Sequence, residues 1–217
     1  MILAIFDVDR TLIKGDSLKQ FGVFLWKKNR LRLSRVPGFI ACLSAWCLRF
    51  TDTETLKNAY VDMLCGGMQE TEVDALGREF AETRLRPNIF PRAVESIERH
   101  KADGHKVVFL SASLDVYLDA LAHLLGADAL VCTKVLRQEG FLTGGLDGSN
   151  CKGREKLRRL LECYDEEKID WRRSYAYADS STDLPILERV GTAVAVNPER
   201  KLVLAAVERG WRMENWH

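Results

Sequence analysis

The 217-residue chain has no strong excess of charge of either sign, because 32 lysines and arginines stand against 31 aspartates and glutamates, a formal net charge of +1. A basic surface that would attract nucleic acid is therefore not expected. The chain also contains no internal repeat, and no apolar run reaches the roughly 20 residues that a membrane-spanning helix needs. These absences favour an ordinary globular protein whose function depends on a local site.

Cysteines and histidines are few and are not grouped. No C-x-x-C pair or zinc-finger spacing links the six cysteines, and the four histidines show no spacing typical of a metal or catalytic pair. Free thiols in a reducing compartment are expected. Because the apolar start is only six residues long and no basic segment precedes it, it does not resemble a secretory signal, and a cytoplasmic location is expected.

Residues 36–50 form the longest apolar stretch, with Pro37 and Gly38 near its start and several basic residues before it. Its 15 residues are too few to cross a bilayer of about 30 Å as a helix. We expect a helix buried inside the protein. The alternative is a helix that rests on anionic lipid, with the basic residues on the headgroups.

Short apolar segments alternate with helical patterns, which predicts an α/β fold with a parallel, Rossmann-like sheet. The segments expected as strands cover residues 1–6, 106–110, 129–133, 174–178 and 193–196, with two further short strands at 135–137 and 141–143. Residues 16–87 read as three or four helices. The predicted division is a core of residues 1–15 plus 88–217 and an inserted helical domain of residues 16–87.

Three of the predicted strands end in polar residues. Asp7, Asp9 and Thr11 follow the first, Ser111 and Ser113 the second, and Asp179 and Asp183 the strand that ends at 178. Because the carboxyl ends of parallel strands meet at one edge of a sheet, these side chains are expected to form one site. Close carboxylates need a cation or a shared proton. A hard cation such as Mg²⁺ suits them, with Asp7 and Asp179 as the best side-chain ligands.

A carboxylate can also attack phosphorus and form an aspartyl-phosphate. Asp7, the first residue after the strand, is the candidate nucleophile, and Asp9 is the candidate acid and base that protonates the leaving alcohol and then activates water. Ser111 offers a hydroxyl and a backbone N–H to the phosphate oxygens. The lysine that such chemistry needs is Lys152 or Lys156.

With these motifs in this order, the chain resembles the haloacid dehalogenase superfamily of phosphohydrolases, and in particular its phosphoserine-phosphatase-like branch, subfamily IB. The resemblance covers essentially the whole chain and implies a helical cap of type C1 between the first and second motifs. It favours Lys156 over Lys152. It also implies a magnesium contact from the backbone carbonyl of Asp9, with Asp183 holding metal-bound water or the lysine.

The resemblance further implies which residues hold the substrate. Asp16 lies where amino-acid-phosphate enzymes of the branch keep an acidic residue for the substrate ammonium, although helix capping explains it equally well. The substrate-binding set is Thr11, Ser111, Ala112, Asp16 and Asp183. Two residues depart from the family pattern. Arg10 replaces a small residue, and Ala178 replaces a glycine.

We therefore expect a Mg²⁺-dependent phosphatase of a small phosphate ester, such as phosphoserine or histidinol phosphate. One alternative is a phosphatidylglycerophosphate-type lipid phosphatase at the membrane surface, which the apolar segment 36–50 keeps open. Another is a binding module that has the fold without turnover. The presence of Asp7, Asp9, Asp179 and a motif lysine argues against the latter.

Overall fold

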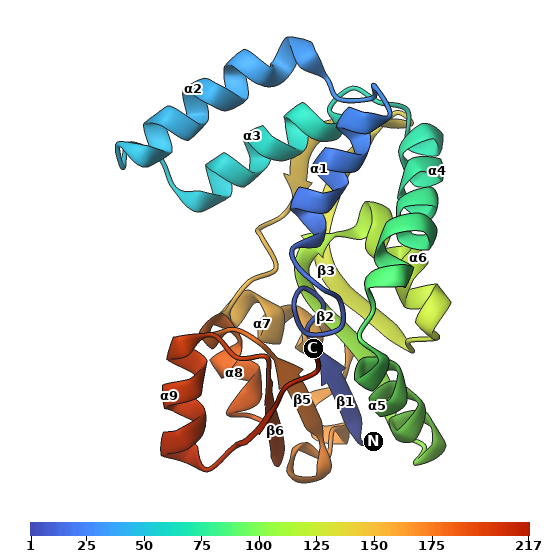
Figure 1. Cartoon of the computed structure of the whole chain (residues 1–217), viewed down its shortest axis with the longest axis vertical. Coiled ribbons are helices and arrows are strands. Elements are labelled where there is room, and N and C mark those ends of the chain that lie inside the picture. The colour runs from blue at the N-terminus through green and yellow to red at the C-terminus, as the bar shows by residue number, and fades with distance from the viewer.

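The computed structural model describes all residues from 1 to 217. Its centre is a seven-stranded sheet in the order β4-β3-β2-β1-β5-β6-β7 (Figure 1). All neighbouring strands are parallel except β4, which is antiparallel to β3. The strands are β1 (Leu3–Phe6), β2 (Lys106–Leu114), β3 (Ala129–Gln138), β4 (Phe141–Asp147), β5 (Tyr175–Ala178), β6 (Thr192–Val196) and β7 (Arg212–Glu214). The predicted α/β fold with a mostly parallel sheet is confirmed.

The strand β1 lies at the centre of the sheet, between β2 and β5, and all four of its residues are buried. Successive side chains of a strand point to opposite faces. Ala4 and Phe6 accordingly belong to the larger apolar core, and Leu3 and Ile5 to the smaller one on the other face. This burial on both sides is why β1 is a continuous apolar run.

Helices cover both faces of the sheet. The smaller core is closed by α7 (Arg154–Cys163), α8 (Leu184–Leu187) and α9 (Arg200–Arg209). The larger core includes side chains of α5 (Pro91–Ala102) and α6 (Asp115–Leu125), together with three of the helices that lie between β1 and β2 in the sequence.

Four helices are inserted between β1 and α5: α1 (Ser17–Lys27), α2 (Val36–Cys47), α3 (Thr53–Cys65) and α4 (Glu70–Phe80), the last continued by a π-helical turn, Ala81–Leu85. They occupy the top of the molecule in Figure 1. Phe21 of α1 packs against Tyr117 of α6, with ring centroids 5.0 Å apart. The insert and one face of the sheet therefore share one apolar core, and the division into a core and a cap domain stays a prediction.

The β3–β4 hairpin joins the sheet to the inserted helices. The backbone N–H of Gly67 donates to the carbonyl of Leu142 at 2.7 Å, and that of Leu146 donates to Oδ1 of Asn58 at 2.9 Å. Gly144 has a φ of +91°, and a Cβ there would lie 2.8 Å from the Cα of Asp62 on α3. Only glycine allows this close approach of β4 to α3.

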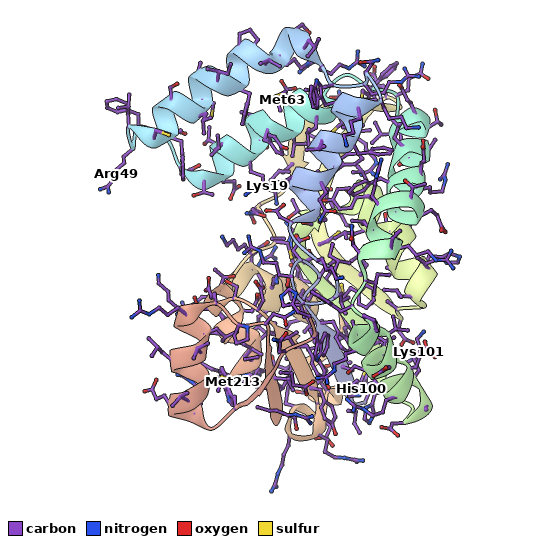
Figure 2. All side chains as sticks on the ribbon, in the orientation of Figure 1. Lys19, Arg49, Met63, His100, Lys101 and Met213 are labelled. Atoms are coloured by element: carbon purple, nitrogen blue, oxygen red, sulfur yellow. The ribbon has the colours of Figure 1, made fainter.

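The expectation of a buried helix in residues 36–50 is wrong. The helix α2 forms there, but none of its residues is buried, because it packs on α3 with one side only. Arg49, just beyond its end, extends from the far tip of the α2–α3 pair in Figure 2. No helix of the chain is long and apolar enough to span a bilayer.

Smaller differences concern the ends of elements. The segment 135–137, expected as a separate strand, is the continuation of β3. The edge strand β7 was not predicted, because three residues with no alternating pattern give no signal for a strand.

Candidate active site

A small cleft of about 120 Å³ lies beside the carboxyl ends of β1 and β5. The parallel register that pairs Phe6 with Tyr177 brings the residues after both strands to the same edge. Most of the residues predicted from the sequence line this cleft: Asp7, Asp9, Asp16, Ala112, Lys152, Lys156, Asp179 and Asp183. The structure therefore brings together the groups that the motifs nominated.

Lys156, in the first turn of α7, is the central cation of the site. Its Nζ lies 2.6 Å from Oδ1 of Asp7 and 2.6 Å from Oδ1 of Asp183, and the lysine is 3% exposed. Burial alone would lower the pKa of its ammonium, but the two carboxylates outweigh that effect and raise it above the ordinary value. Lys156 is thus held as a cation, whereas Lys152 is exposed at the rim.

Asp9 is held from two sides. The backbone N–H of Ser17, at the start of α1, donates to Oδ1 of Asp9 at 2.7 Å, and the hydroxyl of Ser113 donates to Oδ2. Burial is the main reason that the pKa of Asp9 is raised to about 6, and the charge of Asp7 adds to it. A carboxyl group with such a pKa can both give and take a proton near neutral pH.

Asp179 lacks such partners. Its carboxylate accepts no hydrogen bond, and its nearest cationic atom is Nη1 of Arg10 at 3.9 Å. Burial, followed by the charges of Asp7 and Asp183, raises the pKa of Asp179 to about 7. Carboxylate oxygens of Asp7, Asp179 and Asp183 all lie within 4.8 Å of one another. This buried group of oxygens fits a hard divalent cation, which would offset the excess of negative charge.

Two predicted residues, Thr11 and Ser111, contribute from beneath the cleft. The hydroxyl of Thr11 donates to Oδ2 of Asp7 at 3.2 Å. The hydroxyl oxygen of Ser111 accepts the N–H of Ser113 at 3.0 Å, within the irregular last part of β2 that carries Ala112 to the cleft. Thr11 and Ser111 are fully buried, so their direct contact with substrate stays a prediction.

Asp16 and Arg10 lie at the mouth. Asp16 accepts the N–H of Lys19 at 3.0 Å as the N-cap of α1, and it also lines the cleft, so both interpretations of this residue agree with the geometry. Arg10 has a φ of +60°, and its exposed side chain points toward Asp179. The departure from the family pattern at this position therefore places a cation next to the carboxylates.

Sequence reasoning missed Lys57, on α3 of the insert. Its Nζ donates to the carbonyl of Ala112 and lies 2.6 Å from Oδ1 of Asn150 and 3.2 Å from Oγ1 of Thr133. Burial lowers the pKa of Lys57 to about 8. A single lysine within a helical pattern gave no signal that it reaches the strand ends of the sheet.

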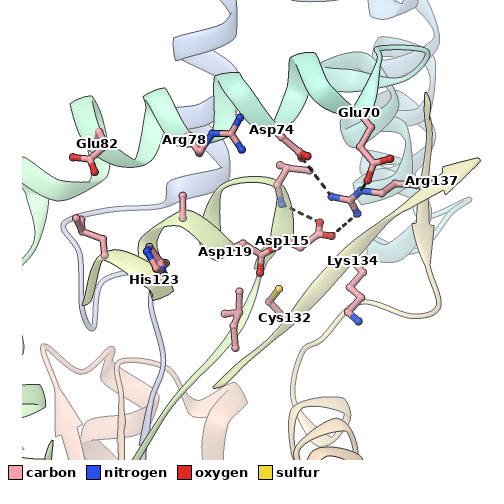
Figure 3. A pocket seen from close by; sticks show the side chains of 14 residues that line it. Glu70, Asp74, Arg78, Glu82, Asp115, Asp119, His123, Cys132, Lys134 and Arg137 are labelled. Carbon is pink, nitrogen blue, oxygen red and sulfur yellow. Dashed lines mark hydrogen bonds and ion pairs between the residues drawn. The ribbon is translucent and has the colours of Figure 1, made fainter. Parts of the chain in front are cut away.

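A larger cleft, of about 790 Å³, lies elsewhere, between α4, α6 and β3 (Figure 3). Arg137 holds its acidic groups together, with Nη1 2.6 Å from Oδ2 of Asp115 and Nε 3.0 Å from Oε1 of Glu70. These paired charges stabilise the contact between the hairpin and α4. None of the residues predicted for the site lines this cleft.

Four carboxylates around a buried lysine at the ends of parallel strands suit phosphoryl transfer. Residues 4–188 match the model of the haloacid dehalogenase-like hydrolases, and the chain belongs to this family. It is a phosphatase of this family, a phosphoric monoester hydrolase.

Two similar proteins carry names of small-molecule phosphatases. The phosphoserine phosphatase SerB1 of Mycobacterium tuberculosis is 29% identical over 98% of this chain and 70% of its own length. The histidinol-phosphatase of Neisseria meningitidis is 28% identical over 99% and 98%. A solved structure of a Bordetella pertussis protein of unknown function superposes with a TM-score of 0.86, at 25% identity, over 99% of this chain and 98% of that one.

Replacing Lys156 is expected to destabilise the fold. Lys156→Met leaves Asp7 and Asp183 buried without their cation, which costs about 3 kcal/mol of unfolding free energy at pH 7.5. The loss is measured by urea denaturation. The difference from the wild type should shrink as the pH falls to 5.5. Burial already raises the pKa of Asp183 and Lys156 lowers it, so without the lysine this pKa rises further and the folded variant takes up protons that the folded wild type does not.

The matched control is Lys152→Met, which removes an exposed lysine four residues earlier and should change stability by less than about 0.5 kcal/mol. Equal effects of the two substitutions, or a pH-independent loss in Lys156→Met, would contradict the role given to the ion pairs.

Proposed function

We propose that the protein is a Mg²⁺-dependent phosphomonoesterase that works through an aspartyl-phosphate on Asp7. The observation that carries this proposal is the placement of Asp7, which lies at the end of the central strand and is held by Lys156 and Thr11. Asp9, a second carboxyl group with a raised pKa, lies two residues further on. One group is thus positioned to attack phosphorus and the other to move a proton.

The carboxylates of Asp7 and Asp179 would hold the cation, with the backbone carbonyl of Asp9 as a further ligand and Asp183 beside them. Bound there, Mg²⁺ would neutralise charge on the phosphate oxygens and orient the ester for in-line attack. The unpartnered carboxylate of Asp179 supports this assignment, since a buried anion without a hydrogen bond is unstable unless it binds a cation or a proton.

In the first step an oxygen of Asp7 forms a bond to phosphorus while the bond from phosphorus to the alcohol oxygen breaks. Lys156 orients Asp7 and contributes positive charge next to the reacting phosphoryl group. The departing alkoxide takes a proton from Asp9. In the second step Asp9 takes a proton from water, which attacks phosphorus and releases phosphate and free Asp7.

The hydrogen bonds to Asp9 suit this double role. Both donors, the N–H of Ser17 and the hydroxyl of Ser113, lower the pKa of Asp9, whereas burial raises it, and the result is a value of about 6. The acid is therefore strong enough to give up its proton and basic enough to recover one near neutral pH.

The substrate is proposed to be a small phosphate ester with a positively charged amino group, such as phosphoserine or histidinol phosphate. The names of the curated relatives support this class. Asp16 supports it as well, since its carboxylate lines the cleft at the mouth and can accept hydrogen bonds from an ammonium group. Lys57 joins the inserted helices to the strand ends, so these helices would close one side of the substrate site.

The first test is hydrolysis of p-nitrophenyl phosphate with and without Mg²⁺. Asp7→Asn keeps the shape of the side chain but removes the nucleophile, and kcat should fall by about a thousandfold or more. The exposed Asp147→Asn is the matched control and should keep wild-type kcat. Full activity of Asp7→Asn, or hydrolysis that EDTA does not reduce, would contradict the proposed mechanism.

The second test concerns the amino group of the substrate. Asparagine caps a helix as well as aspartate does, so Asp16→Asn should leave the stability of α1 unchanged. It should raise KM for phosphoserine or histidinol phosphate by about tenfold, the usual cost of losing a charged hydrogen bond. KM for p-nitrophenyl phosphate should stay the same, and an equal rise for both kinds of substrate would show that Asp16 only positions the helix.

A further inference from the structure

The outer side of α2 is an apolar surface without a partner. No charged residue occurs between Val36 and Leu48. We define the α2 face by its exposed apolar residues together with those of the two flanking turns, which are Leu33, Ile40, Leu43, Leu48 and Phe50. Phe50 is 82% exposed and Leu48 is 67% exposed, although such side chains are normally buried.

Packing within the chain uses only the opposite side of α2. Phe39 contacts Tyr60 of α3, with ring centroids 5.3 Å apart, and Val36 packs on the edge of the main core. Figure 1 shows α2 as the outermost helix, with α3 between it and the sheet. A helix that is apolar on all sides but covered on one side points to a partner outside the chain.

The charge of the surrounding segment indicates the nature of that partner. Residues 17–51 contain seven lysines and arginines and no aspartate or glutamate. Lys28, Arg30 and Arg35 form ion pairs with carboxylates of α3 and α4, but Lys27 and Arg49 form none. Arg49 directly adjoins Leu48 and Phe50 at the tip of the pair (Figure 2).

Tryptophans complete the pattern. Trp46 of α2 is 40% exposed, and Trp26 near the end of α1 is 63% exposed. An indole ring has an apolar body and one N–H donor, which suits the boundary between lipid chains and headgroups. Apolar side chains, unpaired basic residues and exposed tryptophans together are typical of a helix that lies in the plane of an anionic membrane surface.

We propose that the α2 face docks on the surface of an anionic bilayer, with α2 parallel to the membrane plane. At about 1.5 Å per residue the 12-residue helix is about 18 Å long, so it rests on the membrane and does not cross it. Ile40 and Phe50 enter the boundary between headgroups and chains, and Arg49 contacts lipid phosphates. Since α3 separates α2 from the sheet, the cleft around Asp7 stays uncovered.

Sedimentation with vesicles tests this proposal independently of the phosphatase chemistry. The purified chain is mixed at 0.1 M salt with vesicles of phosphatidylcholine alone or with 30% phosphatidylglycerol. We expect binding to the anionic vesicles and at least tenfold weaker binding to the neutral ones. The double variant Ile40→Gln/Phe50→Ser should bind the anionic vesicles at least tenfold more weakly, and Arg49→Glu about fivefold or more weakly.

Leu204→Gln/Val207→Gln is the matched control, because both residues are 66% exposed on α9, at the other end of the molecule. This control should bind like the wild type, and circular dichroism should show that all variants are folded. Absence of binding to the anionic vesicles, or equal loss in the control, would overturn the proposal. A wild-type dimer that Ile40→Gln/Phe50→Ser converts to monomers, without vesicle binding, would assign the α2 face to a second copy instead.

Discussion

The site depends on one buried interaction, the ammonium of Lys156 between the carboxylates of Asp7 and Asp183. Four aspartates meet at the ends of two adjacent strands, and their mutual repulsion and burial would prevent all of them from being ionised. Lys156 neutralises part of this charge. Burial, followed by the charge of Asp7, raises the pKa values of Asp179 and Asp9, the groups proposed to hold the cation and to move the proton.

The order of the sheet produces this arrangement. Because β1 is the central strand and β5 is its parallel neighbour, residues more than 170 positions apart, Asp7 and Asp179, end at the same edge. The first turn of α7 brings Lys156 to that edge from the side of the smaller core. The inserted helices approach from the opposite end, and Lys57 is their contact with the strand ends.

Most of this could be predicted from the sequence, because short apolar strands that end in polar residues identify a parallel sheet and its functional edge. The strands β1, β2 and β5 and the grouping of Asp7, Asp9, Asp179 and Asp183 were predicted in this way. Lys156 was favoured over Lys152 only by the family resemblance. Lys57 was not, since its role depends on how α3 packs over Ala112. The hydrogen bonds of Ser17 and Ser113 to Asp9 likewise depend on the relative position of α1 and β2, which no local pattern encodes.

The wrong prediction for residues 36–50 has a physical origin. Apolar composition shows that a segment avoids water, but it does not show what covers the segment, and a buried helix and a surface-docking helix have the same composition. The structure excludes the buried helix, because α3 covers only one side of α2. The sequence feature that favours the surface helix is the absence of any acidic residue from 17 to 51.

Trapping of the covalent intermediate tests the central claim most directly. Enzyme that is turning over p-nitrophenyl phosphate is quenched in acid and reduced with borohydride, which converts an acyl phosphate of aspartate to homoserine, and its peptides are then analysed by mass spectrometry. The mechanism predicts homoserine at position 7 and at no other aspartate. Homoserine at position 9 or 179 would contradict the mechanism. The absence of homoserine would contradict it as well, provided that the same enzyme has been shown to release product in a burst.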